Sequence, residues 1–319
     1  MKLGSFKCED GNSYGLIFED EWFDIKKAAN KLKIKNPGNN LKTFLKKQYN
    51  DGYNYLERIL DVYYKSPNIF SEFVRSIDHD SWLPPISDKP RLFTQRGNSC
   101  LNSRLSNLEF PNNPVFELRF PHPNVGHNSE FTITPGLKGG WNPELVVVIG
   151  KQGKNIKLDN AYDHIAGYTI LIDHAGNIEG RMDDWMVDEE DRVLWDAFFY
   201  TGFFGNLVSP HPIGPWITID ENINPDNLWV SACEKRNEVR IVEKVHSSAL
   251  LFSFSETISF LSTFVTLKPG DMISSGSIGY DSYPHWDYYP DGSYIEVEAE
   301  NIGNLRMNIN DIRGGEDDK

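Results

Sequence analysis

The chain has 319 residues, with 32 basic and 46 acidic side chains, so its formal net charge is −14. Its hydrophobic fraction of 39% and aromatic fraction of 13% are those of a folded globular protein and exclude a disordered chain. The negative charge disfavours sequence-independent binding to nucleic acid or to an anionic lipid surface, so we expect neither partner.

Cysteine usage and hydropathy bear on the compartment. Cys8, Cys100 and Cys233 are an odd number without Cys-X-X-Cys spacing, which predicts reduced thiols in a cytoplasmic protein. The N-terminal segment lacks the apolar core of a signal peptide. The most apolar stretch, residues 249–267, contains Glu256 and several serines, so it is too polar to span a membrane. Its large apolar residues recur at helical spacing, which predicts an amphipathic core helix over residues 249–266.

The N-terminal quarter of the chain changes from strand-like to helical patterning. Within residues 1–28, two apolar runs flank the turn-forming segment 9–12, which predicts a β-hairpin. From Asp24 to Arg75, apolar residues recur at helical spacing between lysine-rich segments. Pro84 and Pro85 then break this pattern, because proline removes a backbone donor and forces its predecessor into an extended conformation. We therefore predict a small N-terminal α+β domain over residues 1–85.

The remaining residues, 86–319, predict a second, strand-dominated domain. Runs rich in β-branched residues alternate with clusters of Gly, Pro and Asn. With one helix among many strands, the fold class is α+β and β-rich. The predicted strands are residues 114–120, 144–150, 167–173, 215–219, 228–234, 238–245, 271–276 and 293–301.

Six segments of this second domain resemble the fumarylacetoacetate hydrolase superfamily in their order and approximate spacing. The resemblance implies a mixed β-roll or β-sandwich catalytic domain behind a small N-terminal domain, assembled as a homodimer. It also implies a divalent cation, Mg²⁺ or Mn²⁺, and a small-molecule substrate such as an acylpyruvate or an oxaloacetate-like diacid. The segments are residues 141–150, 164–173, 212–216, 267–271, 275–279 and 301–306.

The resemblance also implies a metal site made by Glu-X-Glu on one strand and Asp on the next. Residues i and i+2 of a strand share a face, so both can reach one ion, and hard cations prefer oxygen ligands. The matching residues are Glu144 and Asp173, whereas Asn142 stands where the family has its first Glu. We predict these three as ligands of a weakly held ion, since one negative charge is missing. The alternative is that Glu144 is a surface carboxylate at a strand end and Asp173 a turn residue.

The catalytic base departs further from the family pattern. Asn98 matches the family's Asn-Tyr-X-X-His segment, but Asn102 stands in place of the histidine. Asparagine cannot accept a proton at neutral pH, so we expect Asn102 to be a hydrogen-bonding group of the pocket. We expect Glu243, His246 or both to transfer the proton, because they match positions that face the substrate in the family. The alternative for His246 is that it caps or precedes the helix predicted over 249–266.

Substrate-binding residues follow from the same resemblance. Ser275, Gly276 and Ser277 match a Thr-Gly-Thr segment whose hydroxyl and backbone amides hold a substrate carboxylate. Arg119 matches a lysine and is predicted to be a second anion contact. The alternatives are a glycine-rich turn and a surface cation. The family's substrate-binding arginine is absent from residues 173–177.

Three functions are compatible with this pattern. The first is a metal-dependent enzyme that forms a metal-stabilised enolate of a 2-oxo acid or 1,3-dicarbonyl compound and cleaves a C–C bond by hydrolysis or decarboxylation. The second is a lyase or isomerase, because residues 142–144 and 178–180 resemble dehydratases of 2-keto-3-deoxy sugar acids. The third is a catalytically silent binding protein on the same scaffold.

Overall fold

The structure is a computed structural model of the chain. It describes residues 1–52, 54–77, 81–101, 110–119, 125–132, 137–178, 211–279 and 289–310. For residues 137–139, 174–178 and 239–242 only the backbone is described. Asn102, with the segments 179–210 and 280–288, therefore lies outside the described residues.

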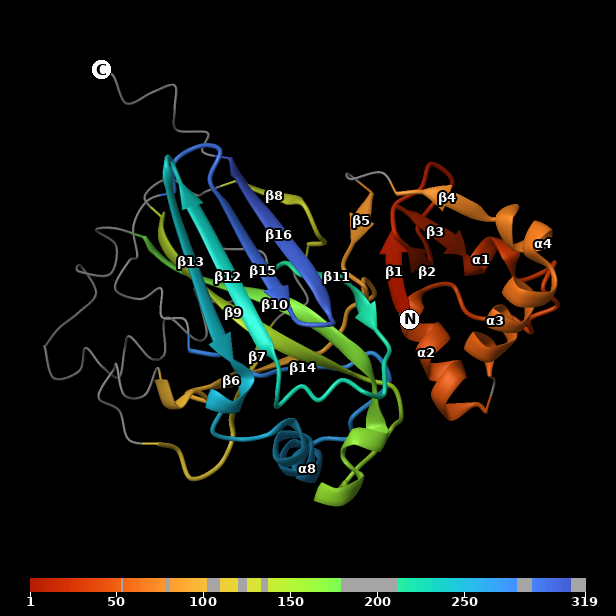
Figure 1. Ribbon diagram of the computed structural model, residues 1–319. Helices are drawn as coiled ribbons and strands as arrows, with labels where there is room; N and C mark the ends of the chain where they lie inside the picture. The colour runs from red at the N-terminus through yellow and green to blue at the C-terminus, as the bar shows by residue number, and fades with distance from the viewer. Residues whose placement is uncertain are drawn as a thin grey trace, which may run out of the picture.

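Two β-sheets stack face to face (Figure 1). The large sheet has eleven strands in the order β4-β3-β2-β1-β11-β10-β9-β14-β6-β7, with β5 paired to β1. The second sheet has five strands in the order β13-β12-β15-β16-β8. The strands of the large sheet are β1 (Lys2–Phe6), β2 (Ser13–Phe18), β3 (Glu21–Asp24), β4 (Val74–Ser76), β5 (Trp82–Leu83), β6 (Leu92–Arg96), β7 (Val115–Arg119), β9 (Leu137–Ile149), β10 (Ile165–Ile178), β11 (Ile213–Thr218) and β14 (Met272–Ser274). Those of the second are β8 (Ser129–Thr132), β12 (Trp229–Arg236), β13 (Val239–His246), β15 (Tyr294–Ala299) and β16 (Gly303–Asn310).

The central strand β9 is buried on both faces. Leu145 and Val147 point into the core between the two sheets, whereas Val146 and Val148 point into a second core under the N-terminal helices. A strand covered on both sides needs a continuous apolar run rather than an alternating one, which is what residues 145–149 supply. The start of β9 breaks this pattern with polar side chains, and the candidate site lies there.

The N-terminal part carries four short helices, α1 (Ile25–Ala28), α2 (Leu41–Asn50), α3 (Tyr55–Lys65) and α4 (Pro67–Ser71). They gather beside strands β1–β4, on one side of the molecule (Figure 1). The predicted hairpin is confirmed, since β1 and β2 pair antiparallel. Strand β1 also pairs with β11, so the large sheet runs across the predicted boundary without a break. The division at residue 85 stays a prediction.

The predicted helix over 249–266 is shorter in the structure. Helix α8 spans Phe254–Phe264, and Ser253 caps it in a reciprocal arrangement with Glu256. This capping box satisfies the first free backbone amides, so the helix begins there rather than at 249. Phe254, Ile258 and Leu261 are buried, which confirms the predicted apolar face.

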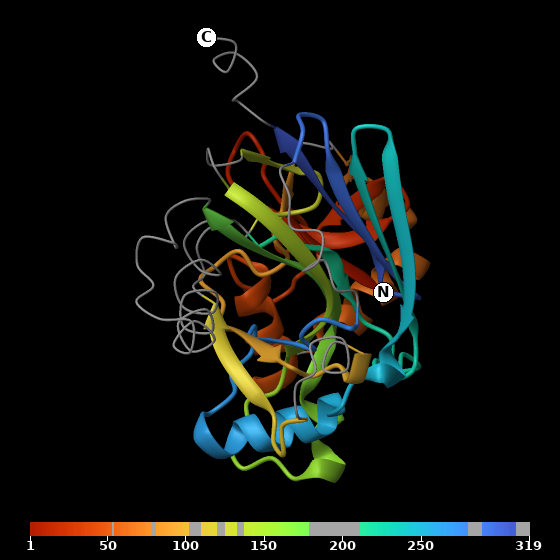
Figure 2. The ribbon, with the colours of Figure 1, turned by 90° about the vertical axis from the view of Figure 1, so that its left-hand side faces the viewer.

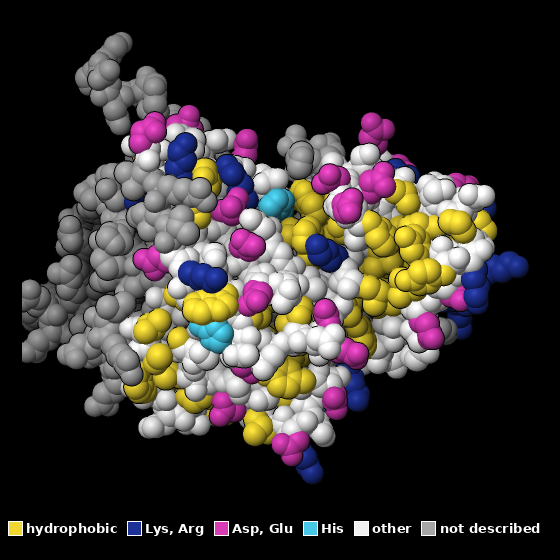
Figure 3. Space-filling view, viewed as in Figure 1, with side chains coloured by type: hydrophobic (Ala, Val, Ile, Leu, Met, Phe, Trp, Pro, Cys, Tyr) yellow, Lys and Arg dark blue, Asp and Glu magenta, His cyan; other side chains and the backbone are white. Residues whose placement is uncertain are grey.

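The β-rich α+β fold is confirmed, and each predicted strand overlaps an observed one. Strands β3, β4, β5, β6, β8 and β16 lie outside the predicted strands. Cys8, Cys100 and Cys233 are all free thiols. Among the described residues, no helix combines the length and apolar character needed to cross a membrane. Acidic side chains are scattered over the face shown in Figure 3 rather than gathered in one patch.

Candidate active site

Two buried carboxylates mark the start of β9 and the matching part of β10. Asp173 lies opposite Asn142 and Leu171 lies opposite Glu144, so Asn142, Glu144 and Asp173 share one face of the sheet. Glu144 is 3% exposed and Asp173 is 6% exposed. Such burial rules out the surface alternative for Glu144, and Asp173 lies inside a strand rather than in a turn.

Arg119 reaches these acids from the far edge of the large sheet. Its Nη2 lies 2.8 Å from Asp173 Oδ2, and its Nη1 lies 3.0 Å from Glu117 Oε2. Strands β9, β14 and β6 lie between β10 and β7 in the sheet, so this contact requires a strongly curled sheet. The curvature is visible in Figure 2. Arg119 is only 5% exposed, so it is not the surface cation considered as its alternative.

His211 contacts the second oxygen of Asp173. Its Nδ1 lies 3.2 Å from Asp173 Oδ1, and the residue is completely buried. His211 was not among the predicted site residues, although it directly precedes the segment 212–216 that resembles the family. That adjacency was the one available signal, because the contact depends on the register between β10 and β11.

Glu144 is held by the loop that follows β14. Ser274 Oγ donates a hydrogen bond to Glu144 Oε2. Ser274 Oγ in turn accepts a hydrogen bond from the N–H of Gly276 at 3.0 Å. Gly276 has a φ of +69°, and a Cβ added to it would lie 2.4 Å from the carbonyl oxygen of Gln95. Only glycine therefore fits this turn.

The amides predicted to bind a substrate carboxylate are partly engaged inside the protein. The N–H of Ser275 donates to the carbonyl of Leu145 at 2.8 Å, and Ser275 Oγ accepts from the N–H of Leu145 at 3.1 Å. Together with the Gly276 bond, these contacts make the loop a support for β9. Carboxylate binding by Ser275, Gly276 and Ser277 stays a prediction.

Asn98 ties this loop to the entry of α8. Its Nδ2 donates to the carbonyl of Ser275 at 2.9 Å, and its Oδ1 accepts from the N–H of Phe252 at 2.8 Å. Asn98 is 2% exposed, so these bonds satisfy its amide without water. Asn98, which matched the family segment, thus stabilises the backbone beside the site.

Charge and burial shift the pKa values of Glu144 and Asp173 in opposite directions. Burial and the negative charge of Asp173 raise the pKa of Glu144 well above its ordinary value. Burial would also raise the pKa of Asp173, but the nearby Arg119 and His211 outweigh it and leave that pKa below its ordinary value. Burial raises the pKa of Glu117 as well, even though Arg119 and Arg96 oppose it.

The donor set suits an oxygen-bound divalent cation in charge and chemistry. Among the described residues, Glu117, Glu144 and Asp173 surround one buried guanidinium, so acids outnumber arginines there. Carboxylate and amide oxygens are the ligands that Mg²⁺ and Mn²⁺ prefer. Within the described residues, however, no three His, Cys, Asp or Glu side chains meet as a ready metal cluster. A site built from Asn142, Glu144 and Asp173 would need the amide as its third donor.

The structure does not bring His246 to these acids. Its Nδ1 accepts from the N–H of Ser248 at 3.3 Å, capping a 3-10 turn over Ser247–Ala249, and its ring packs edge-on against Trp229. The capping alternative for His246 is therefore the one observed, although the capped element is this turn rather than α8.

Glu243 lies on the edge strand β13, exposed and opposite Ala232. Ala232 faces the core between the sheets, to which β9 contributes Trp141 and Leu145. Glu144 projects from the other face of β9, so strand alternation separates it from Glu243. A proton-transfer role for Glu243 or His246 stays a prediction.

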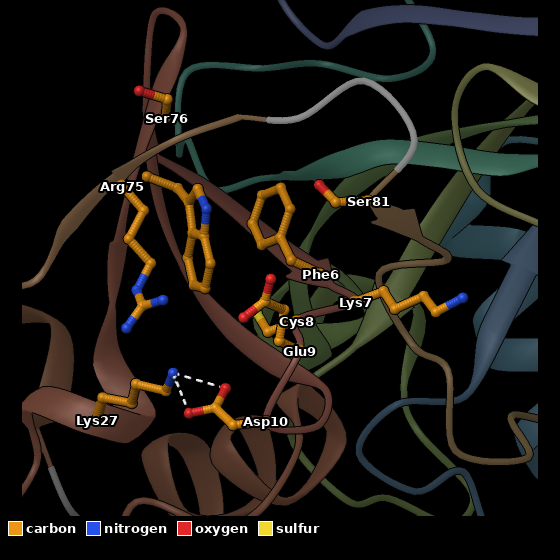
Figure 4. A pocket seen from close by; sticks show the side chains of 10 residues that line it. Phe6, Lys7, Cys8, Glu9, Asp10, Lys27, Arg75, Ser76 and Ser81 are labelled. Carbon is orange, nitrogen blue, oxygen red and sulfur yellow. Dashed lines mark hydrogen bonds and ion pairs between the residues drawn. The ribbon is translucent and has the colours of Figure 1, made fainter.

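Two cavities lie away from the acid cluster. One of about 460 Å³ opens in the N-terminal part, where the rings of Phe6 and Trp22 stack and Lys27 pairs with Asp10 (Figure 4). Another of about 520 Å³ lies between the segment Trp82–Pro84 and residues 125–130. Neither is lined by Glu144, Asp173 or Arg119.

Comparison with known proteins places this geometry in a family. Residues 93–310 match the model of the fumarylacetoacetate (FAA) hydrolase C-terminal domain. An uncharacterised protein of Methanocaldococcus jannaschii is 32% identical over 64% of this chain and 76% of its own length. A mitochondrial oxaloacetate tautomerase of Rattus norvegicus is 28% identical over 70% of this chain and 67% of its own length.

Solved structures share the fold. Fumarylacetoacetate hydrolase from Exiguobacterium antarcticum superposes with a TM-score of 0.70 at 18% identity, covering 98% of this chain and 99% of that one. Maleylpyruvate hydrolase from Sphingobium sp. SYK-6, in complex with manganese(II) and pyruvate, gives a TM-score of 0.68 at 19% identity, with 98% and 99% covered.

Proposed function

Because the chain belongs to the fumarylacetoacetate (FAA) hydrolase family, we propose that it is an enzyme that converts a 2-oxo acid or 1,3-dicarbonyl compound through its enolate. The observation that carries the proposal is the buried cluster of Glu144, Asp173 and Arg119 on one face of the curled sheet. Keto–enol proton transfer is the favoured outcome, since several relatives are named oxaloacetate tautomerase. C–C bond cleavage, the reaction of the family's hydrolases, is the second candidate.

A Mg²⁺ or Mn²⁺ ion would be held by the oxygens of Asn142, Glu144 and Asp173, which share a face across β9 and β10. When bound, such a cation supplies Lewis-acid polarisation of a substrate carbonyl. Asn142 is neutral, so we expect weaker binding than a site with three carboxylates would give.

The chain's own groups orient the acids and shape the electrostatics. Ser274 fixes Glu144 by a hydrogen bond, and Arg119 fixes Asp173. Arg119 also places a permanent positive charge in a buried setting, where it favours the negative charge that develops on an enolate or on a substrate carboxylate. Burial of the acids keeps water from competing for these contacts.

The test is turnover of oxaloacetate and of acylpyruvates in the presence of Mg²⁺ or Mn²⁺, with loss of the enol followed by ultraviolet absorption and products identified by NMR. We expect Glu144→Gln and Asp173→Asn to lose turnover, while Glu298→Gln, which removes an exposed carboxylate on β15, keeps it. Unchanged turnover in both site variants would remove these acids from the mechanism. A folded protein that binds neither cation and converts no compound of the panel would support the silent binding protein.

A further inference from the structure

We propose that His211 is a positioning residue that holds the Asp173 carboxylate through the close contact of its Nδ1 with Oδ1. The proposal deepens the function proposed above, because Asp173 is one of the acids expected to bind the cation. It concerns orientation of a carboxylate rather than proton transfer by the imidazole.

The two oxygens of Asp173 are contacted from two different segments, His211 shortly before β11 and Arg119 at the end of β7. His211 Nδ1 lies 3.2 Å from Oδ1, and Arg119 Nη2 lies 2.8 Å from Oδ2. All three side chains are at most 8% exposed, and that of His211 is fully buried. The carboxylate accepts a hydrogen bond from Arg119 at Oδ2 and has the imidazole against Oδ1, so turning about its terminal torsion would lose a contact. We infer that these two contacts fix its direction before any ligand arrives.

The backbone that follows His211 is tied down by two hydrogen bonds. The N–H of Ile172, next to Asp173, donates to the carbonyl of Pro212 at 3.0 Å, and the N–H of Ile213 donates to the carbonyl of Val125 at 2.9 Å. Pro212 itself has a restricted φ. These restraints hold the imidazole opposite Asp173 across the β10–β11 pair.

The chemistry of the contact defines what a replacement must supply. An ionised carboxylate only accepts hydrogen bonds, so the contact is attractive when Nδ1 carries the hydrogen; this tautomer is assigned from the partner. The amide nitrogen of asparagine can occupy the place of Nδ1, whereas that of glutamine extends to the place of Nε2. Leucine fills the space with no donor.

The experiment compares His211→Asn, His211→Gln and His211→Leu with the unaltered protein, using Mn²⁺ alone as the probe in calorimetric titration. Partners that orient a metal ligand typically contribute about 10- to 100-fold to affinity, so we expect that loss in the leucine and glutamine variants. The asparagine variant should remain within roughly threefold of the unaltered protein. Equal affinity in all four proteins would overturn the proposal.

Crystal structures of the same variants without metal provide a readout that does not depend on the proposed function. We expect Asp173 to keep its orientation with asparagine and to turn away from it with leucine. An unmoved Asp173 in both would refute positioning even if Mn²⁺ binds. Failure of the unaltered protein to bind Mn²⁺ would count against the proposed function, while the crystal structures still decide the role of His211. If the leucine variant does not fold, the asparagine and glutamine variants carry the comparison.

Discussion

Two clusters of buried charged side chains lie on opposite faces of β9, one built around a single carboxylate and the other around three, and they differ in charge balance. On one face, Glu234 accepts hydrogen bonds from the indole N–H of Trp141 and from Arg236, whose guanidinium also stacks on the ring of Tyr289 at 4.0 Å. One buried carboxylate thus has one cation and one neutral donor. On the other face, among the residues that the structure describes, three acids share one buried arginine, with the half-exposed Arg96 and the imidazole of His211 as further neighbours.

We interpret this difference in charge balance as the difference between a carboxylate that stabilises the fold and carboxylates that bind a ligand. A balanced pair such as Glu234 and Arg236 fixes the second sheet against the start of β9 and leaves no charge to be met from outside. The unbalanced cluster holds excess negative charge in a buried place, which lowers the stability of the empty protein. Such charge is tolerated where a ligand of opposite charge is bound, so the imbalance itself points to the site.

The largest expected effect tests whether Arg119 is the counter-charge of the cluster. Arg119→Met removes the buried guanidinium from Asp173 and Glu117, and breaking a buried pair in this way costs about 3–5 kcal/mol of unfolding free energy. Urea denaturation monitored by circular dichroism measures it. Arg96→Met is the matched control, since an exposed cation of the same cluster contributes below about 1 kcal/mol. Equal losses in the two variants would contradict the assignment.

Asp173→Asn should have the next largest effect, with a pH signature. The pKa of Asp173 is lowered in the folded state, so its ionised form stabilises the protein above the ordinary pKa near 3.9. We expect the variant to be less stable by about 2 kcal/mol at neutral pH. That difference should shrink as the pH falls below about 3.9 through the lower folded value. A difference independent of pH would mean that the charge of Asp173 is not what stabilises the fold.

Glu144→Gln should change the stability in the opposite direction to Asp173→Asn. The pKa of Glu144 is raised in the folded state, so stability is fully present below its ordinary value near 4.3 and is lost as the pH rises toward the folded value. The neutral glutamine escapes this loss and should stabilise the protein by about 1–2 kcal/mol at neutral pH. Glu234→Gln, in the balanced cluster, should destabilise it. Destabilisation by both, measured as unfolding free energy against pH, would erase the contrast between the clusters.

The sequence predicted those features of the fold and the site that depend on residues close together in the chain. Apolar runs predicted the strands, and i, i+2 spacing on β9 placed Asn142 and Glu144 on one face, where Asp173 joins them. The capping box at Ser253 was also present in the sequence, but the apolar periodicity extended beyond it and gave too long a helix.

The contacts that give the acids their character could not be read from the sequence. His211 meets Asp173 through the β10–β11 register, and Arg119 meets it because the sheet curls across the three strands between β10 and β7. Family resemblance placed Glu243 and His246 at substrate-facing positions, yet their strand belongs to the sheet on the other side of β9. Side-chain direction depends on register, which short motif matches do not determine.

The smallest expected effect on the unfolding free energy is that of substituting His246, which lies outside both clusters. His246 caps the turn Ser247–Ala249 through an acceptor nitrogen, and asparagine offers an acceptor oxygen at a similar reach, so His246→Asn should change the unfolding free energy by less than about 0.5 kcal/mol. Glu243→Gln, at an exposed position, should be equally mild. Because stability is unaffected, turnover in these variants reports chemistry alone. Retained turnover in both would restrict catalysis to the unbalanced cluster on the other side of β9. A large fall in either, with the fold intact, would restore the proton-transfer role predicted from the sequence and require that β13 contribute to the site.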